Sequence, residues 1–111
     1  MKKLIVAAAA IALFAGGVFA HPAKSIELTI TGTRVDINVV HQVKDPAKHY
    51  IDQIEVLVDG KKLVTQAFTL QKDMNGQSAT YIIPEIKPGS KVKVITNCNK
   101  GGKLTVEKKA Q

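Results

Sequence analysis

The chain of 111 residues contains a single cysteine, Cys98. One cysteine excludes an internal disulfide, so the fold is not a small disulfide-linked scaffold. In an oxidising compartment a lone cysteine is buried and inert, bridges to another chain, or is held by a metal ion. Composition leaves these three alternatives open.

Tryptophan is absent, and aromatic residues make up only 5% of the chain. Arginine occurs once, at Arg34, and the lysines are scattered rather than clustered. A nucleic-acid-binding surface usually combines a basic patch with aromatic side chains that stack on bases. The sequence therefore predicts no nucleic-acid partner, although the formal net charge is +7.

Several motifs of common enzyme classes are missing as well. The sequence has no G-x-S-x-G nucleophile motif, no glycine-rich phosphate loop and no pair of carboxylates spaced for acid–base catalysis. It also shows no internal repeat and no low-complexity tract. Any chemistry must therefore come from other residues.

The N-terminus has the pattern of a secretory signal peptide. Lys2 and Lys3 give a positive start, residues 4–14 form an unbroken apolar run, and small residues Val18 and Ala20 precede a cleavage point. We predict a signal peptide at 1–20 and a single domain at 21–111, located in the periplasm or secreted. Without the two N-terminal lysines, 14 basic and 9 acidic residues remain, a net charge of +5.

An uncleaved membrane anchor is the alternative interpretation of this segment. The apolar stretch 4–20 is short for a helix that crosses a bilayer and contains two glycines. No cysteine follows the run directly, which excludes a lipoprotein anchor. We therefore expect no stable membrane association after cleavage.

Alternating apolar and polar residues dominate positions 21–111, and helical periodicity is almost absent. Turn residues separate the alternating stretches, and Asp59-Gly60 is a strong hairpin signal. We predict an all-β domain, an immunoglobulin-like β-sandwich of about seven strands. The expected strands lie at 26–30, 35–39, 54–58, 63–70, 79–83, 92–98 and 104–106.

The three histidines and the cysteine all fall at strand ends or at the start of the mature chain. His21 would be the first mature residue, His41 ends the second expected strand, His49 opens the third, and Cys98 ends the sixth. Strand ends joined by loops are where sandwich proteins gather binding residues. Imidazole nitrogens with a thiolate suit iron, copper or zinc. Taken singly, the histidines are also ordinary loop residues and Cys98 an ordinary buried apolar one.

Two motifs resemble a known family. Residues 49–60, HYIDQIEVLVDG, resemble the H-Y-I-x-x-I-x-L-x-x-D-G segment of the superoxide reductase (desulfoferrodoxin) iron-binding domain. Residues 98–102, CNKGG, resemble that family's C-N-x-H-G motif. The resemblance covers about 41–106, and the two motifs stand in the family's order.

The resemblance implies an immunoglobulin-like sandwich that binds one non-haem iron through four histidines and an axial cysteine. It also implies a one-electron reduction of superoxide to hydrogen peroxide. Carried over by position, His49 and Cys98 match family ligands, His41 is the match for a third ligand, and His21 stands in for the N-terminal one.

The sequence departs from the family pattern at the remaining ligand. Gly101 occupies the place of the fourth histidine, and Gln42 stands where the family has a proline after its histidine. The spacing from His41 to His49 is two residues longer, and the lysine that precedes the first family histidine has no counterpart. We therefore expect reductase activity that is weak or lost.

Two further expectations concern charge and an added ligand. Lys48, beside His49, is the candidate for attracting superoxide, the alternative being an ordinary solvated loop lysine. Cleavage after Ala20 would free the α-amine of His21, so that amine and imidazole chelate from one residue, which favours copper.

Three functions follow from these observations. The first is a superoxide-reductase-like iron domain whose partner is superoxide or a small redox partner. The second is a non-enzymatic periplasmic metal carrier, with copper in place of iron. The third is a metal-free sandwich that serves as a binding module.

Overall fold

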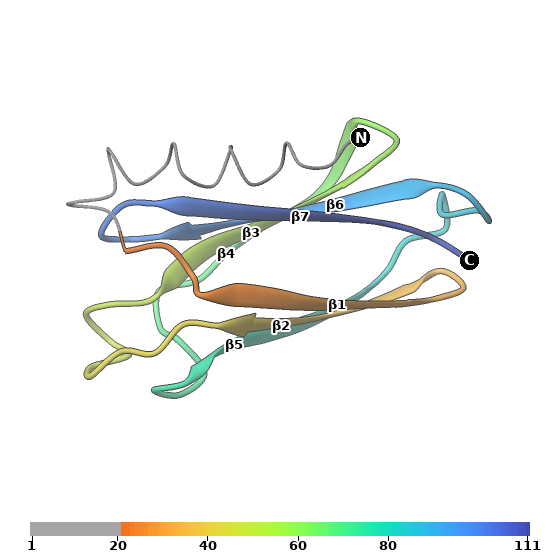
Figure 1. The fold of residues 1–111 in the computed structure, drawn as a ribbon. Helices are drawn as coiled ribbons and strands as arrows, with labels where there is room; N and C mark the ends of the chain where they lie inside the picture. The colour runs from red at the N-terminus through yellow and green to blue at the C-terminus, as the bar shows by residue number, and fades with distance from the viewer. Residues whose placement is uncertain (1–20) are drawn as a thin grey trace, which may run out of the picture.

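The computed structural model describes residues 21–111, and the predicted signal peptide at 1–20 lies outside the described residues. The described chain forms seven strands in two antiparallel sheets, which confirms the all-β sandwich prediction (Figure 1). One sheet has the order β1-β2-β5 and the other β4-β3-β6-β7. The strands are β1 (Ser25–Thr31), β2 (Arg34–Val40), β3 (Ile51–Val58), β4 (Lys61–Ala67), β5 (Gly76–Ile82), β6 (Lys91–Cys98) and β7 (Lys103–Lys109). Within residues 21–111, no helix has the length and apolar character needed to cross a membrane.

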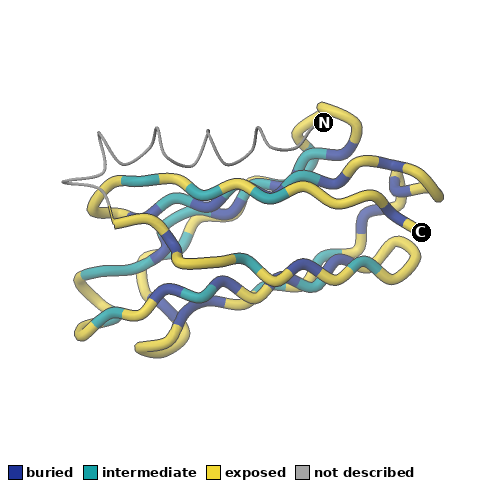
Figure 2. Tube along the Cα trace, viewed as in Figure 1, coloured by how far each residue is buried: buried dark blue, intermediate teal, exposed yellow. Residues whose placement is uncertain are grey.

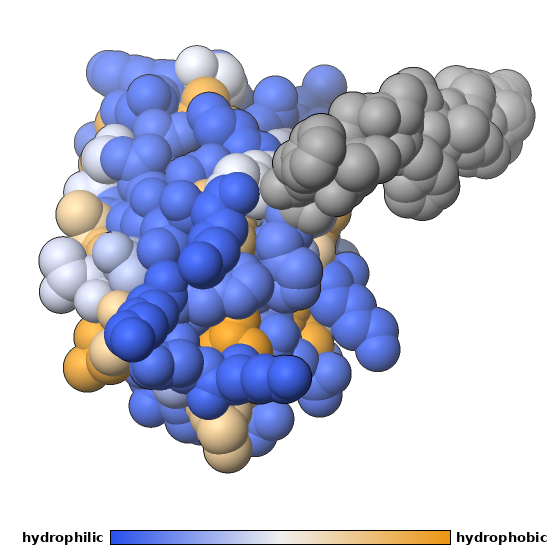
Figure 3. Space-filling view, turned by 90° about the vertical axis from the view of Figure 1, so that its left-hand side faces the viewer, coloured by the Kyte–Doolittle hydropathy of each residue, from blue (hydrophilic) through white to orange (hydrophobic). Residues whose placement is uncertain are grey.

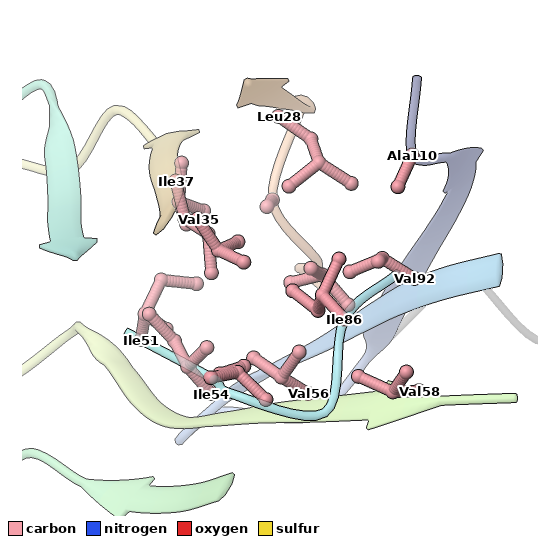
Figure 4. Packing of buried hydrophobic residues seen from close by; sticks show 14 residues of the cluster. Leu28, Val35, Ile37, Ile51, Ile54, Val56, Val58, Ile86, Val92 and Ala110 are labelled. Carbon is pink, nitrogen blue, oxygen red and sulfur yellow. The ribbon is translucent and has the colours of Figure 1, made fainter. Parts of the chain in front are cut away.

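The core lies between the two sheets because alternate side chains of each strand point inward. Figure 2 shows buried and exposed positions alternating along the strands, and Figure 4 shows the buried aliphatic side chains converging between the sheets. Burial of each large aliphatic side chain contributes about 1.5–3 kcal/mol. The fully buried set is rich in β-branched residues and includes Val35, Val39, Ile51, Ile54, Val56, Val92 and Val94.

The hairpin between β3 and β4 forms as the sequence predicted. Asp59 and Gly60 both have positive φ, 49° and 84°, which suits a two-residue hairpin turn. The strand expected at 63–70 is wrong at its end, because β4 stops at Ala67. Beyond it the chain turns toward the 41–50 loop, where the Gln71 N–H donates to the Pro46 carbonyl (3.1 Å), and Leu70 is left 57% exposed.

One end of the sandwich collects four chain segments that are distant in sequence. The start of β1 lies beside the end of β2, and Ile51 at the start of β3 pairs with Cys98 at the end of β6. These segments lie together on the left of Figure 1. A register shift between Ile51 and Gln53 marks a β-bulge at this end of β3. Bulges of this kind redirect side chains beside functional sites.

Candidate metal centre

The structure brings together all four residues that the sequence analysis identified as metal ligands. His21 precedes β1, His41 follows β2, His49 lies in the loop before β3, and Cys98 is the last residue of β6. Each offers one ligand atom, and these atoms all lie within 4.8 Å of one another. Cys98 and His41 are buried, His49 is half-buried, and His21 is exposed at the surface. The loops at one sheet end thus assemble a His₃Cys cluster.

The spacing of the cluster matches the size of a metal coordination sphere. Bonds of about 2.0–2.3 Å from a metal to nitrogen or sulfur place opposite ligands about 4.0–4.6 Å apart. His21 Nδ1 lies 3.3 Å from His41 Nε2, as two adjacent ligands of one ion would. The His49 ring centroid lies 4.3 Å from that of His21 and 5.0 Å from that of His41. A small inward movement would therefore close the cluster on one ion.

A buried glutamine, Gln71, sets the tautomer of His41. The Gln71 side chain is 2% exposed, and its Nε2 donates to the carbonyls of His41 (2.8 Å) and Asp73 (3.0 Å). Its Oε1 accepts from the Ile51 N–H (3.1 Å), so the orientation of the amide is fixed. Oε1 must then also accept from His41 Nδ1–H, at 2.8 Å. In the neutral ring, His41 Nε2 therefore carries a lone pair directed at the cluster.

No sequence pattern identifies Gln71 as a functional residue. It lies in a loop, one residue after an exposed leucine, where neither strand alternation nor a family motif distinguishes it. A buried polar side chain in a loop becomes apparent only when its partners are known.

His49 carries a buried ring nitrogen without a hydrogen-bond partner among the described residues. This nitrogen is Nε2. Burial, followed by electrostatic effects of His21, His41 and Lys100, lowers the pKa of His49. The neutral ring with an available lone pair is thus the favoured state, which is the state that binds metal.

Cys98 is held in a turn that directs backbone N–H groups at its sulfur. Burial raises the pKa of the Cys98 thiol, and the Lys100 N–H, 3.4 Å from Sγ, partly offsets this effect. The Cys98 N–H donates to the Gly102 carbonyl (3.0 Å), and the Gly101 N–H donates to the Cys98 carbonyl (2.8 Å). A buried thiol of this kind ionises readily only beside a cation such as a bound metal.

Gly101 contacts the N-terminal part of the cluster through its backbone. Its carbonyl accepts a hydrogen bond from the His21 N–H at 2.8 Å. Gly101 has φ +107°, a conformation that residues with a side chain rarely adopt. The position that the resemblance assigns to a histidine is therefore a glycine with a backbone role in this chain.

A surface cleft of about 530 Å³ opens over the cluster. Lys48 lines it, as do Lys44 and Lys100, whereas Asp45 is its one acidic residue. Figure 3 looks onto this end of the molecule and shows a mainly hydrophilic surface with a few small apolar areas. His21 and His49 line the cleft, while His41 and Cys98 do not. Anions therefore meet positive charge at the mouth, with two imidazoles beneath it.

The ligand atoms of the cluster suit a bound cation better than they suit hydrogen bonds with one another. His41 Nε2 lies 3.1 Å from the His21 carbonyl oxygen, and the buried His49 Nε2 is unpartnered within the described chain. Neutral imidazoles and carbonyls that face one another in this way have more lone pairs than donors. A metal ion satisfies such lone pairs, and three imidazoles with one thiolate suit iron, copper or zinc.

This fold is that of the superoxide reductases. The structure resembles a superoxide reductase (1Fe-SOR) from Giardia intestinalis with TM-score 0.60 and 19% identity, over 81% of this chain and 97% of that one. Neelaredoxin, a superoxide reductase from Ignicoccus hospitalis, matches with TM-score 0.56 and 19% identity, over 100% and 98% of the two chains. A hypothetical protein from Pyrococcus horikoshii matches with TM-score 0.56 and 20% identity, over 86% and 93%.

Comparison of the sequence alone finds no relative. No protein-family model and no curated protein matches the chain. The structural matches therefore establish a superoxide reductase-like β-sandwich, which confirms the fold that the two sequence motifs implied.

Proposed function

We propose that this protein is an exported, superoxide-reductase-like iron protein whose His₃Cys cluster binds one non-haem iron. The observation that carries the proposal is the convergence of three imidazoles and a buried thiol, with ligand atoms within 4.8 Å of one another, at one end of a superoxide reductase-like fold. The signal-peptide pattern at 1–20 supports a location in the periplasm or outside the cell.

Each of the four residues would supply one ligand atom to the metal. Cys98 would supply the thiolate from the buried end of β6, and His41, oriented by Gln71, would supply a fixed imidazole. His49 would add its unpartnered nitrogen, and His21 would complete the set from the surface side. Hydrogen bonds to a metal ligand, such as the one between Gln71 and His41, tune both metal affinity and redox potential.

Bound iron would supply one-electron redox chemistry, by which superoxide, one electron and two protons would give hydrogen peroxide. The lysines at the cleft, Lys48 among them, would raise the local concentration of this anion. Lys48 is proposed to guide the substrate rather than to react with it. Its effect should weaken as salt screens the charge.

Three imidazoles rather than four distinguish this centre from the family pattern. The sequence holds only three histidines, so no rearrangement supplies a fourth. We propose that the reductase rate is correspondingly lower than in a four-histidine centre. Removal of one nitrogen ligand changes both the affinity for iron and its potential.

Anaerobic reconstitution with ferrous iron tests the proposal. The mature protein, starting at His21, is compared with a Cys98→Ser variant of the same length. We expect near-stoichiometric iron in the parent protein and a thiolate-to-iron charge-transfer band on oxidation, with the band lost in the variant. Reduced protein should then consume superoxide and form peroxide without forming dioxygen.

Other outcomes would identify a different function. Tight copper binding without iron binding would make the protein a metal carrier. Failure to bind any metal would contradict the proposal and leave the metal-free sandwich surface as the binding element.

A further inference from the structure

We propose that signal-peptide removal completes the metal centre: the α-amino nitrogen of His21, positioned by the Gly101 carbonyl, becomes a ligand in place of the missing fourth histidine. This inference rests on the proposed metal-binding function and on cleavage after Ala20. It concerns how the centre is assembled and which atoms hold the ion.

The first supporting observation is which ring nitrogen of His21 faces the cluster. Nδ1 of His21, not Nε2, lies 3.3 Å from His41 Nε2. Nδ1 is the ring nitrogen nearer the backbone of its own residue. A metal on Nδ1 and on the α-nitrogen closes a six-membered ring through Cα, Cβ and Cγ, which Nε2 cannot do.

The second observation is the chemical state of the His21 backbone nitrogen. Joined to Ala20, this nitrogen is an amide whose lone pair is delocalised into the carbonyl, so it donates a hydrogen bond but does not bind Fe²⁺. Cleavage converts it into an amine. A neutral amine has a lone pair and two N–H groups, so it can bind an ion while still donating to an acceptor.

The third observation is that an acceptor is already in place. The His21 backbone nitrogen donates to the Gly101 carbonyl at 2.8 Å. Gly101 belongs to the same turn as Cys98, and the Gly101 N–H donates to the Cys98 backbone carbonyl at 2.8 Å. The amine would therefore be held beside the thiolate loop, the part of the chain that the resemblance expects to supply the fourth imidazole.

Surface position makes this arrangement accessible to a metal ion. His21 is exposed and borders the open cleft, so an ion can reach it from solvent. The completed set has three imidazoles, one amine and one thiolate. This mixture of nitrogen ligands with one soft ligand suits ferrous iron and also copper.

The test compares two proteins that differ by one residue. One begins at His21, and the other keeps Ala20, so that the imidazole is retained and the α-nitrogen of His21 stays an amide. Dissociation constants for Fe²⁺ are measured anaerobically by competition with a chromophoric chelator, because Cu²⁺ would also bind the free amine, deprotonated amide and imidazole of an Ala20-His21 terminus. Because the chelate adds an intramolecular ligand at high effective concentration, we expect binding about 100-fold weaker when Ala20 is present.

As a control for folding, the thermal midpoints of the two metal-free proteins are compared, and they should agree. Equal metal affinities of the two proteins would overturn this inference while leaving the His₃Cys centre in place. Failure of both proteins to bind iron would overturn the proposed function as well. The two failures are thus distinguishable.

Discussion

His41 Nδ1 donates a 2.8 Å hydrogen bond to Gln71 Oε1, and the amide of Gln71 cannot rotate without losing three other hydrogen bonds. This pair connects the end of β2 with the loop that follows β4. It fixes which nitrogen of the ring faces the cluster and how the ring is turned.

Substitution of Gln71 tests this relationship. Gln71→Leu keeps a similar volume but removes the acceptor, so we expect metal affinity to fall by about 10- to 100-fold. Gln71→Glu is the matched control: buried beside the His41 and Asp73 carbonyls, its carboxyl group stays protonated and keeps an acceptor for His41, so affinity should fall less. Chelator competition measures both variants. Unchanged affinity in Gln71→Leu would show that the ring is held by other contacts.

Gly101→His is the substitution that the family resemblance suggests for adding the missing imidazole. We expect it to fail in this chain, because the φ of +107° at this position strains any residue with a side chain. A cost of roughly 1–3 kcal/mol in the free energy of unfolding follows from such a conformation. Gly101→Ala is the matched control, and urea denaturation of the metal-free proteins measures both. Tighter iron binding in Gly101→His, without loss of stability, would contradict this prediction.

Gly76→Ala tests the packing behind His41. A Cβ at Gly76 would lie 1.8 Å from the Val39 carbonyl oxygen and 3.3 Å from the His41 nitrogen. Because both neighbours are backbone atoms, the strands must separate, at a cost of about 1–3 kcal/mol. Chemical denaturation should show the loss. Gly32→Ala, where φ is +61° and a Cβ meets nothing within 4 Å, shows the cost of a positive φ without the clash.

Acidification should destabilise the metal-free protein through His49. Its pKa is lowered in the folded state, chiefly by burial and then by the electrostatic effects of its neighbours. The unfolded chain, with the ordinary histidine pKa of about 6.5, therefore binds the proton more readily. The stabilisation is present above about pH 6.5 and is lost as the pH falls through the depressed folded-state pKa.

Denaturation of the metal-free protein between pH 7.5 and 5 measures this effect, which should be smaller in a His49→Gln variant. An equal slope in both proteins would assign the pH dependence to other groups. In the metal-bound protein the same protonation should compete with the ion and release it.

The sequence predicted the sandwich well because each strand buries alternate side chains, and period-two patterns such as Val35-Ile37-Val39 report that directly. Cys98 followed from the same alternation, since it continues the inward face of Val92 and Val94. The end of β4 was missed because Phe68 and Leu70, with Thr69 between them, continue the apolar–polar alternation after the chain has left the sheet.

The remaining features depend on contacts that local patterns do not encode. The cluster required four segments to meet. The placement of its residues at strand ends was compatible with this, and the family resemblance assigned them to one site. Gln71 is defined by partners 20 and 30 residues away in the chain. The Gly101 carbonyl contact with His21 joins two turns far apart in sequence, through backbone atoms that no side-chain motif describes.

His21 and His41 flank the strands of one sheet, whereas His49 and Cys98 flank those of the other. An ion held by all four would therefore act as a cross-link between the two layers, in a domain whose single cysteine cannot form the inter-sheet disulfide found in antibody domains. Such a cross-link shortens the loops available to the unfolded chain and is lost with the ion. Metal supply would then set how long the protein survives, as well as whether it is active.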